Sequence, residues 1–235
     1  MRKSFLVAAT AALAFGVTGV AHAQNPAPTV DVSASFSPSK AGTKSKPKNE
    51  KLTLTIKNSE ESKTTASKLE VTLPSTVKLS TKGLTQCTES DAEIIETLGQ
   101  VCNSAKAGSG SANAVILANG TRVVFKVTPF VGKNEMLFLL TSEQVENKYV
   151  VHGKISGKKM TITIGPDVQQ PVAGLYTALI DIKTTLSKKK GSNYLFSSNG
   201  CKSRKHKVDV KVTYVPNPTP PGATTASDST DASCS

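Results

Sequence analysis

The chain contains no tryptophan, and its aromatic residues make up only 5% of 235 residues. Proteins that bind or cleave sugars usually present aromatic rings to the sugar, so this shortage argues against a lectin and against a glycosidase. The 17 aspartates and glutamates do leave room for the pair of facing carboxylates that a glycosidase needs. Whatever core the protein has must be built from aliphatic side chains.

Histidine is also scarce, since only His152 and His206 follow residue 23. The G-x-S-x-G nucleophile elbow of a serine hydrolase is missing. His152 lies in a strand-like pattern. His206 lies in a run of basic residues, so we expect a positively charged surface histidine that is a poor base. No closely spaced ligand pair indicates zinc, and the sequence therefore predicts no catalytic residue, no metal site and no cofactor.

The first residues have the features of a secretory signal peptide. Arg2 and Lys3 precede an apolar run over 5–20, which ends in the cleavage pattern Ala21-His22-Ala23. Cleavage there would leave a chain that begins at Gln24. An uncleaved anchor is the alternative, but the run is short of the roughly 20 apolar residues of a membrane span. We expect a protein that is secreted, extracellular or associated with the cell envelope, without a transmembrane segment after cleavage.

Four cysteines follow the signal peptide: Cys87, Cys102, Cys201 and Cys234. An even number in an exported protein predicts two disulfides, for which three pairings are possible. We favour Cys87–Cys102 and Cys201–Cys234 because each of these pairs brackets one segment of the chain.

The formal net charge of +12 comes mainly from lysines that are spread along the chain. The plain interpretation of this charge is solubility. A sharper interpretation is attraction to an anionic partner such as a cell-surface polymer. The densest cluster is the candidate anion-binding segment Lys202, Arg204, Lys205 and Lys207. Nucleic acid is an unlikely partner, because export separates the protein from it and the chain offers few aromatic residues for stacking on bases.

Most of the chain alternates between apolar and polar residues, which is the period of a half-buried strand. The pattern predicts strands over 30–36, 51–57, 69–73, 77–79, 115–118, 122–127, 136–140, 149–155, 160–164, 176–186 and 208–214. The run over 136–140 is continuously apolar, which indicates a strand buried on both faces. Asn119-Gly120, between two strands, is a strong hairpin signal. In the long strand we place Ala178, Ile180 and Ile182 on one face.

The remaining segments are predicted from composition. Residues 89–98 form the one convincing helical stretch, with acidic residues at its start and Gly99 after its end. Gly108-Ser109-Gly110-Ser111 is interpreted as a flexible turn and 37–50 as a polar loop. Residues 216–235 form a Pro-, Ser- and Thr-rich tail that composition marks as disordered, although a disulfide to Cys234 would tie it back.

These elements predict an all-β protein: an antiparallel β-sandwich, immunoglobulin-like or jelly-roll, with one short helix between Cys87 and Cys102. The expected organisation is a signal peptide over 1–23, a β-sandwich domain over 24–215 and the tail over 216–235. Two sub-domains divided near 132–134 remain an alternative.

One stretch carries a motif. It consists of Leu73-Pro74, Val77, Leu79, Gly83-Leu84, Cys87, Cys102, Ser104 and Gly108-Ser109-Gly110. With Cys201 and Cys234, it resembles uncharacterised exported β-rich proteins of actinobacteria, which share an LP…gL..C…C…G-x-G motif. The chain departs from their pattern at Ser75-Thr76, where they carry a glycine. The resemblance implies fold, export and disulfide pairing, and it implies no activity.

The leading functional hypothesis is a non-enzymatic β-sandwich protein, secreted or envelope-associated, that binds anionic surface polymers. One alternative is a secreted hydrolase whose active site the fold assembles from residues that no motif reveals. Another is a structural or adhesin module that presents a sheet edge to another surface protein.

Overall fold

The chain folds as an antiparallel all-β protein. The structure, a computed structural model, describes residues 27–60, 64–171, 174–215 and 225–235. The expected signal peptide, 1–23, and the start of the tail, 216–224, lie outside the described residues. Three short helices accompany the strands: α1 (Asp91–Glu96), the 3₁₀ helix η2 (Gln100–Ala105) and α2 (Pro166–Gln169). The all-β class is confirmed, as is a short helix between Cys87 and Cys102.

The strands follow the chain in order. They are β1 (Val30–Ser37), β2 (Lys48–Asn58), β3 (Ala66–Thr72), β4 (Val77–Leu79), β5 (Gly108–Ile116), β6 (Arg122–Val131), β7 (Glu135–Thr141), β8 (Tyr149–Ser156), β9 (Lys159–Thr163), β10 (Thr177–Leu186), β11 (Lys189–Lys190), β12 (Asn193–Tyr194), β13 (Phe196–Ser198), β14 (Lys205–Tyr214) and β15 (Thr225–Ser233). The turn at 132–134 joins β6 to β7, and these two strands pair directly.

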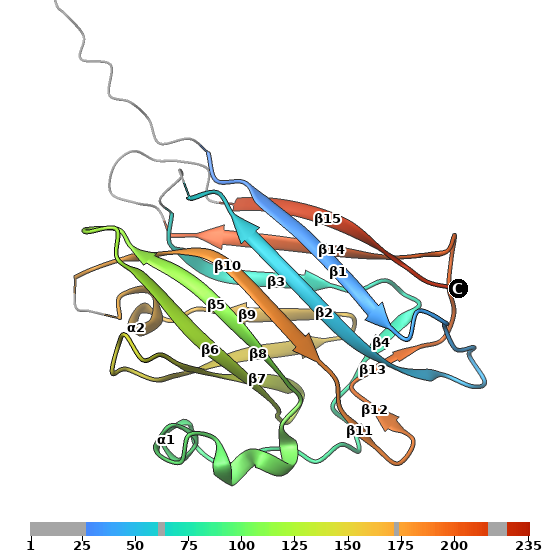
Figure 1. The fold of residues 1–235 in the computed structure, drawn as a ribbon. Coiled ribbons are helices and arrows are strands. Elements are labelled where there is room, and N and C mark those ends of the chain that lie inside the picture. Colours follow the sequence, from blue (N-terminus) through green and yellow to red (C-terminus); the bar gives the residue numbers. More distant parts are fainter. Residues whose placement is uncertain (1–26, 61–63, 172–173, 216–224) are drawn as a thin grey trace, which may run out of the picture.

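All strands except β11 and β12 belong to one continuous sheet. Its order is β15-β14-β3-β9-β8-β7-β6-β5-β10-β2-β13-β4. Strand β13 pairs with residues 48–50 of β2, and β1 pairs with residues 51–58 of β2. The sheet folds over on itself, so that β1, β2, β10, β5 and β6 form one layer and the strands from β15 to β7 form the other (Figure 1). The edge strands β1 and β15 lie side by side, and the Val32 N–H donates to the Asp228 carboxylate at 2.9 Å. Neither an immunoglobulin-like nor a jelly-roll topology is confirmed.

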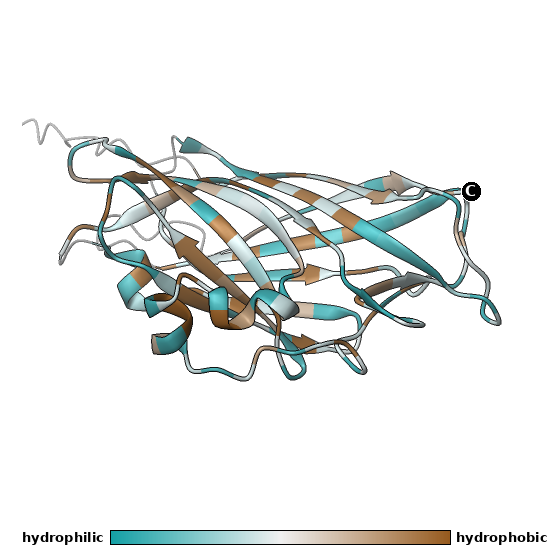
Figure 2. Cartoon of the chain, turned by 60° about the horizontal axis from the view of Figure 1, so that its bottom comes forward, coloured by the Kyte–Doolittle hydropathy of each residue, from teal (hydrophilic) through white to brown (hydrophobic). Residues whose placement is uncertain are grey.

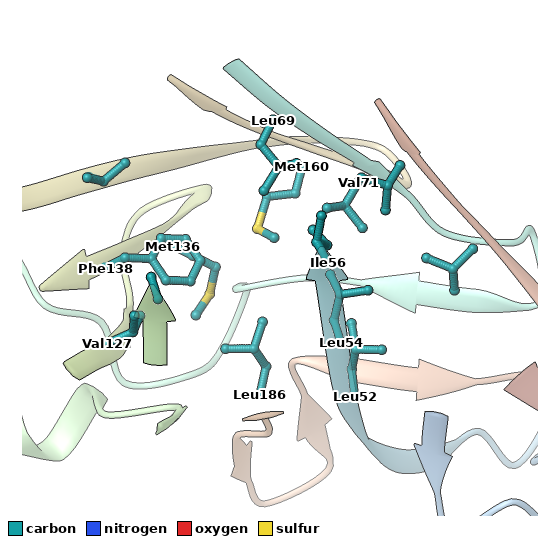
Figure 3. Packing of buried hydrophobic residues seen from close by; sticks show 14 of the residues in the cluster. Leu52, Leu54, Ile56, Leu69, Val71, Val127, Met136, Phe138, Met160 and Leu186 are labelled. Atoms are coloured by element: carbon teal, nitrogen blue, oxygen red, sulfur yellow. The ribbon is translucent and has the colours of Figure 1, made fainter. Parts of the chain in front are cut away.

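The strands form where the sequence alternates, because one face of each strand turns into the space between the layers. In β2, for example, Leu52, Leu54 and Ile56 are buried while Lys51 and Lys57 are exposed. The same alternation appears as bands of apolar and polar residues along the strands in Figure 2. Leucine, valine and methionine side chains from both layers fill the interior in Figure 3, as the shortage of aromatics requires.

Strand β7 is buried on both faces, as its continuous apolar run predicts. Met136 and Phe138 point into the main core between the layers. Leu137 and Leu139 point outward into a second cluster, which they share with Ile94 of α1 and the Cys87–Cys102 disulfide. The helix and the disulfide together cover an outer face of the sheet that would otherwise be exposed.

Two segments differ from the prediction. The expected flexible turn at 108–111 is the first part of β5, which pairs with β10. Glycine allows this close pairing, because a Cβ at Gly108 would overlap the carbonyl oxygen of Thr185. Disorder was the wrong prediction for 225–233, which forms β15 and pairs with β14 along its whole length. Amino-acid composition does not predict such pairing, because main-chain groups make the hydrogen bonds.

Candidate functional site

Both predicted disulfides are present. Cys87 is bonded to Cys102 and Cys201 to Cys234. The second disulfide joins the segment before β14 to the end of β15. Main-chain hydrogen bonds reinforce this junction, with the Cys234 N–H donating to the Arg204 carbonyl at 3.0 Å. The predicted basic segment is therefore held firmly against the end of the chain.

The predicted basic segment forms the turn that leads into β14. Lys205 N–H donates to the Lys202 carbonyl at 3.1 Å, and both intervening residues, Ser203 and Arg204, have positive φ angles of 55° and 59°. A turn with two positive φ angles closes a tight hairpin, so Arg204 lies at its tip. Lys202, Arg204, Lys205 and Lys207 are all exposed.

Two of these four cations have acidic partners. Lys205 Nζ lies 3.0 Å from Asp231 Oδ2 on the neighbouring strand, and Lys207 Nζ lies 3.3 Å from Asp209 Oδ1. Lys202 and Arg204 form no ion pair within the described residues. Exposed ion pairs are weak, about 0–1 kcal/mol, so Lys205 remains available to a stronger anionic partner.

The structure adds a second basic segment, which lies in the region 37–50 where the sequence predicts a polar loop. The segment between β1 and β2 contains Lys40, Lys44 and Lys46, Lys48 is the first residue of β2, and residues 38–48 include no acidic residue. Two hydrogen bonds place it against the end of the chain, from Ala41 N–H to the Ser235 carbonyl at 2.7 Å and from Ser235 N–H to the Ser39 carbonyl at 2.9 Å. Its lysines are exposed except for Lys48, which is half-buried.

Residues more than 150 positions apart thus form one positively charged region at the end of the molecule marked C in Figure 1. We call it the cationic end and define it as Lys40, Lys44, Lys46, Lys48, Lys202, Arg204 and Lys205. Asp231 is the acidic side chain paired within it. Its other six cations form no ion pair with any described residue. The combination of four lysines with no acidic residue over 37–48 was the sequence signal that could have found it.

His206 was wrongly predicted to be an exposed, charged residue. Its side chain is completely buried, because β14 alternates and position 206 faces the interior. Its ring packs edge-on against Phe36, and Nδ1 lies 3.0 Å from the Thr76 hydroxyl. Burial lowers the pKa of His206, so the ring is neutral at neutral pH. The neighbouring basic residues could not have held it positive, since like charges disfavour the protonated form.

Beside His206 lies a buried carboxyl group, that of Glu50 on β2. Its Oε1 lies 3.9 Å from His206 Nε2, and both side chains are fully buried. Burial raises the pKa of Glu50 to about 7, while the Ser198 hydroxyl donates to the Gly200 carbonyl. The carboxyl oxygens and Nε2 make no hydrogen bond within the described part of the chain. The Glu50 carboxyl is therefore largely protonated and uncharged at pH values well below 7.

His152 lies on the outer face of β8, between two carboxylates. Its Nδ1 is 3.1 Å from Glu135 Oε2, and its Nε2 is 3.1 Å from Asp91 Oδ2 at the start of α1. Partial burial lowers the pKa of His152, but hydrogen bonds to Asp91 and Glu135 outweigh this effect and leave the pKa above its ordinary value. With both ring nitrogens held by carboxylates, this histidine ties α1 to the sheet.

No protein-family model matches the chain, and no curated protein matches it either. The site is therefore defined by its own geometry.

Proposed function

We propose that this is a non-enzymatic protein of the cell exterior that binds an anionic polymer through its cationic end. The observation that carries the proposal is the junction of two basic segments, 40–48 and 202–205, at one end of the fold. Export is proposed from the signal-peptide features of residues 1–23, and membership of the exported actinobacterial group from the motif around Cys87. Two disulfides are compatible with an oxidising exterior. Among the described residues, every helix is too short or too polar to cross a membrane.

A polymer is the partner that suits this arrangement. Most of these cations lie on exposed loops or at the hairpin tip, so their charges face the solvent. Several weak contacts must therefore act together, as they do when a chain of phosphate or carboxylate groups passes over the surface. Near an anionic surface each lysine or arginine contributes about 1 kcal/mol, and salt screens such exposed charges beyond about 8 Å at physiological ionic strength.

The test is a fourfold variant with Lys40, Lys46, Lys202 and Arg204 all changed to serine. Its retention on polyphosphate resin and on phosphatidylglycerol vesicles is measured at low salt. Four contacts of about 1 kcal/mol each predict a loss of affinity that approaches roughly a thousandfold. Retention of the native protein should also fall steeply as salt is raised.

The matched control removes the same number of charges elsewhere. Lys57, Lys126, Lys154 and Lys183 are exposed residues on strands β2, β6, β8 and β10, and their change to serine should leave most of the retention intact. Equal losses in both variants would mean that net charge alone attracts the polymer. Undiminished retention of the first variant would contradict the proposed binding site.

A further inference from the structure

The contact between His152 and its two carboxylates requires one protonation state of the ring. Nδ1 lies 3.1 Å from Glu135 Oε2 on β7, and Nε2 lies 3.2 and 3.1 Å from the two carboxylate oxygens of Asp91, the first residue of α1. A neutral imidazole carries a proton on one nitrogen only, whereas an imidazolium donates from both nitrogens. Both carboxylates are therefore satisfied at once only when His152 is positively charged.

Loss of the His152 proton breaks one side of this contact. A neutral ring that donates to Glu135 turns a bare nitrogen toward Asp91, and a ring that donates to Asp91 turns one toward Glu135. In either case a nitrogen lone pair faces a carboxylate oxygen, and the two repel each other. Glu135 belongs to the same sheet as His152, because β7 pairs with β8. Asp91 belongs to a separate helix, which is the part that is free to move away.

Helix α1 supplies no group that could replace His152. Its six residues, Asp91–Glu96, include three acidic residues and no basic one. The Glu93 carboxylate accepts from the Ser90 N–H and hydroxyl, and the Glu96 side chain is exposed. When His152 is neutral, Asp91 therefore loses the one cationic partner that it has among the described residues.

The sheet, by contrast, offers Glu135 a second cation. Lys154 of β8 lies opposite Glu135 of β7 in the strand register, and on its other side β9 places the uncharged Thr161. Glu135 therefore keeps a positively charged neighbour when His152 is neutral. The lost hydrogen bond is the one to Asp91, and hence the one between sheet and helix.

Few other contacts hold α1 to the sheet. Ile94 is its buried residue, and it packs in the outer cluster with Leu137 and Leu139 of β7. Figure 1 shows α1 outside the layer that contains β7 and β8. The Cys87–Cys102 disulfide joins the two ends of the loop that carries the helix. The helix can therefore lift from the sheet while both ends of its loop stay in place.

We propose that His152 is a pH-dependent latch, which holds α1 against β7 and β8 when it is protonated and allows the helix to lift off Leu137 and Leu139 when it is neutral. The proposal does not depend on the binding of a polymer, because the residues of the latch lie outside the two basic segments, 40–48 and 202–205.

The direction of the pH dependence follows from the same contacts. Partial burial lowers the pKa of His152, and the hydrogen bonds to Asp91 and Glu135 raise it by more. A group with a raised pKa stabilises the folded form fully below its ordinary pKa, here 6.5, and this contribution is lost as pH rises through the raised pKa. The latch is thus closed in mildly acidic solution and released above neutral pH.

Hydrogen exchange of the native protein between pH 5.5 and 8.5 tests the latch. The amides of Ile94, Thr97 and Gly99 donate within the helix and its C-terminal turn, so their exchange reports the opening of α1. After division by the rate of an unstructured peptide at each pH, opening should rise roughly three- to fivefold, the worth of one exposed ion pair. The amides of β6 and β7 report global unfolding in the same sample. Equal protection of α1 at both pH values would overturn the proposal.

Three variants identify the group that titrates. In His152→Gln, opening of α1 should no longer depend on pH and should match the native protein at pH 8.5. Asp91→Asn and Glu96→Gln each remove one negative charge from α1, but Asp91 contacts His152 and Glu96 does not. The pH dependence should therefore disappear in Asp91→Asn and persist in Glu96→Gln. A pH dependence that survives in His152→Gln would show that another group controls the helix and would overturn the proposal.

Discussion

Glu50 and His206 are two ionisable side chains that the fold buries completely, next to each other and 3.9 Å apart. Placing a lone charge in an apolar interior is costly, so each group tends toward its neutral form. Burial accordingly raises the pKa of Glu50 to about 7 and lowers that of His206. Both shifts favour the uncharged form of the side chain in the buried site.

The first prediction concerns Glu50→Gln. Because the folded-state pKa lies above the ordinary 4.5, the contribution of Glu50 to stability is fully present below pH 4.5 and is lost as pH rises through 7. Glutamine does not ionise. As the pH rises from 5 to 8, the unfolding free energy of the variant should therefore increase relative to that of the native protein by on the order of 2–4 kcal/mol. Urea unfolding across this range measures the gain.

The control is Glu70→Gln, for which the sign is reversed. A hydrogen bond from Lys159 lowers the pKa of Glu70, so its contribution is present above pH 4.5 and is lost on acidification. Glu70→Gln should therefore lose stability at neutral pH relative to pH 3. Curves for Glu50→Gln and the native protein that run parallel from pH 5 to 8 would contradict the first prediction.

At the scale of single elements, β15 shows how neighbours make a strand from an unpromising sequence. Thr225–Ser233 has only two apolar residues, Ala226 and Ala232. It pairs with β14 on one side, and Asp228 accepts a hydrogen bond from the edge strand β1 on the other. The Cys201–Cys234 disulfide fixes its far end. Main-chain pairing and one covalent bond replace the hydrophobic side chains that strands usually supply.

The second prediction follows from that disulfide. Changing both Cys201 and Cys234 to serine opens a loop of 33 residues, which should lower the free energy of unfolding by about 3–4 kcal/mol. Hydrogen exchange should rise most at the amides of 225–233. The matched variant with Cys87 and Cys102 changed to serine should cost about 3 kcal/mol for its shorter loop but leave those amides protected. Similar exchange of 225–233 in both variants would contradict this role.

Helix α1 has a capping box at its N-terminus. The Ser90 hydroxyl accepts from the Glu93 N–H, and the Glu93 carboxylate accepts from the Ser90 N–H, which together form a capping box. The Ser90 hydroxyl also donates to the Glu93 carboxylate at 2.7 Å, and this bond and the one from the Ser90 N–H lower the pKa of Glu93. A helix of six residues depends on such a cap and on its packing against β7 and β8.

The third prediction is that Ser90→Ala costs about 1 kcal/mol in unfolding free energy. Chemical denaturation measures the loss, and the pKa of Glu93, followed by NMR, should rise toward its ordinary value. The exposed neighbour Glu89 provides the control, since Glu89→Ala should change stability by less than about 0.5 kcal/mol. An unchanged stability in Ser90→Ala would mean that packing alone holds the helix.

At the scale of the whole molecule, the sheet is buried on its inner face and, at β7, on its outer face as well. The main core fills the space between the layers, and α1 with the Cys87–Cys102 disulfide covers the outer side of β7. Charge is also distributed unevenly, since two basic segments meet at one end. A covered face and a cationic end thus occupy separate parts of one fold.

The fourth prediction tests the double burial of β7. Met136→Ala on its inner face and Leu139→Ala on its outer face should each cost about 2–5 kcal/mol, because both side chains are almost completely buried. Val124→Ala on β6, where the side chain is 45% exposed, should cost less than about 1 kcal/mol. A small loss for Leu139→Ala would mean that the outer cluster contributes little to stability.

The sequence predicted the elements well wherever side-chain patterns carry the information. The alternation in β2 and β14, the Asn119-Gly120 hairpin and the apolar run of β7 are all local signals. In β10, however, the alternation predicted one face for Ala178, Ile180 and Ile182, and this was wrong. The register shifts between Leu179 and Asp181, so Leu179 and Ile182 both line an apolar cavity between the layers instead of lying on opposite faces. Ile180 is left without a partner on β5, and such an extra residue reverses the inward and outward faces of the strand beyond it.

The sequence by itself determined the all-β class and the short helix between two cysteines, because residue type and period act over a few residues. For the four cysteines it favoured, among three possible pairings, the one that the structure contains. Only the tertiary structure decided that the lysines over 40–48 lie beside Lys202–Lys205 and that His206 is buried against Glu50. Each of these depends on which distant strands lie together, and that is set by the packing of the whole sheet.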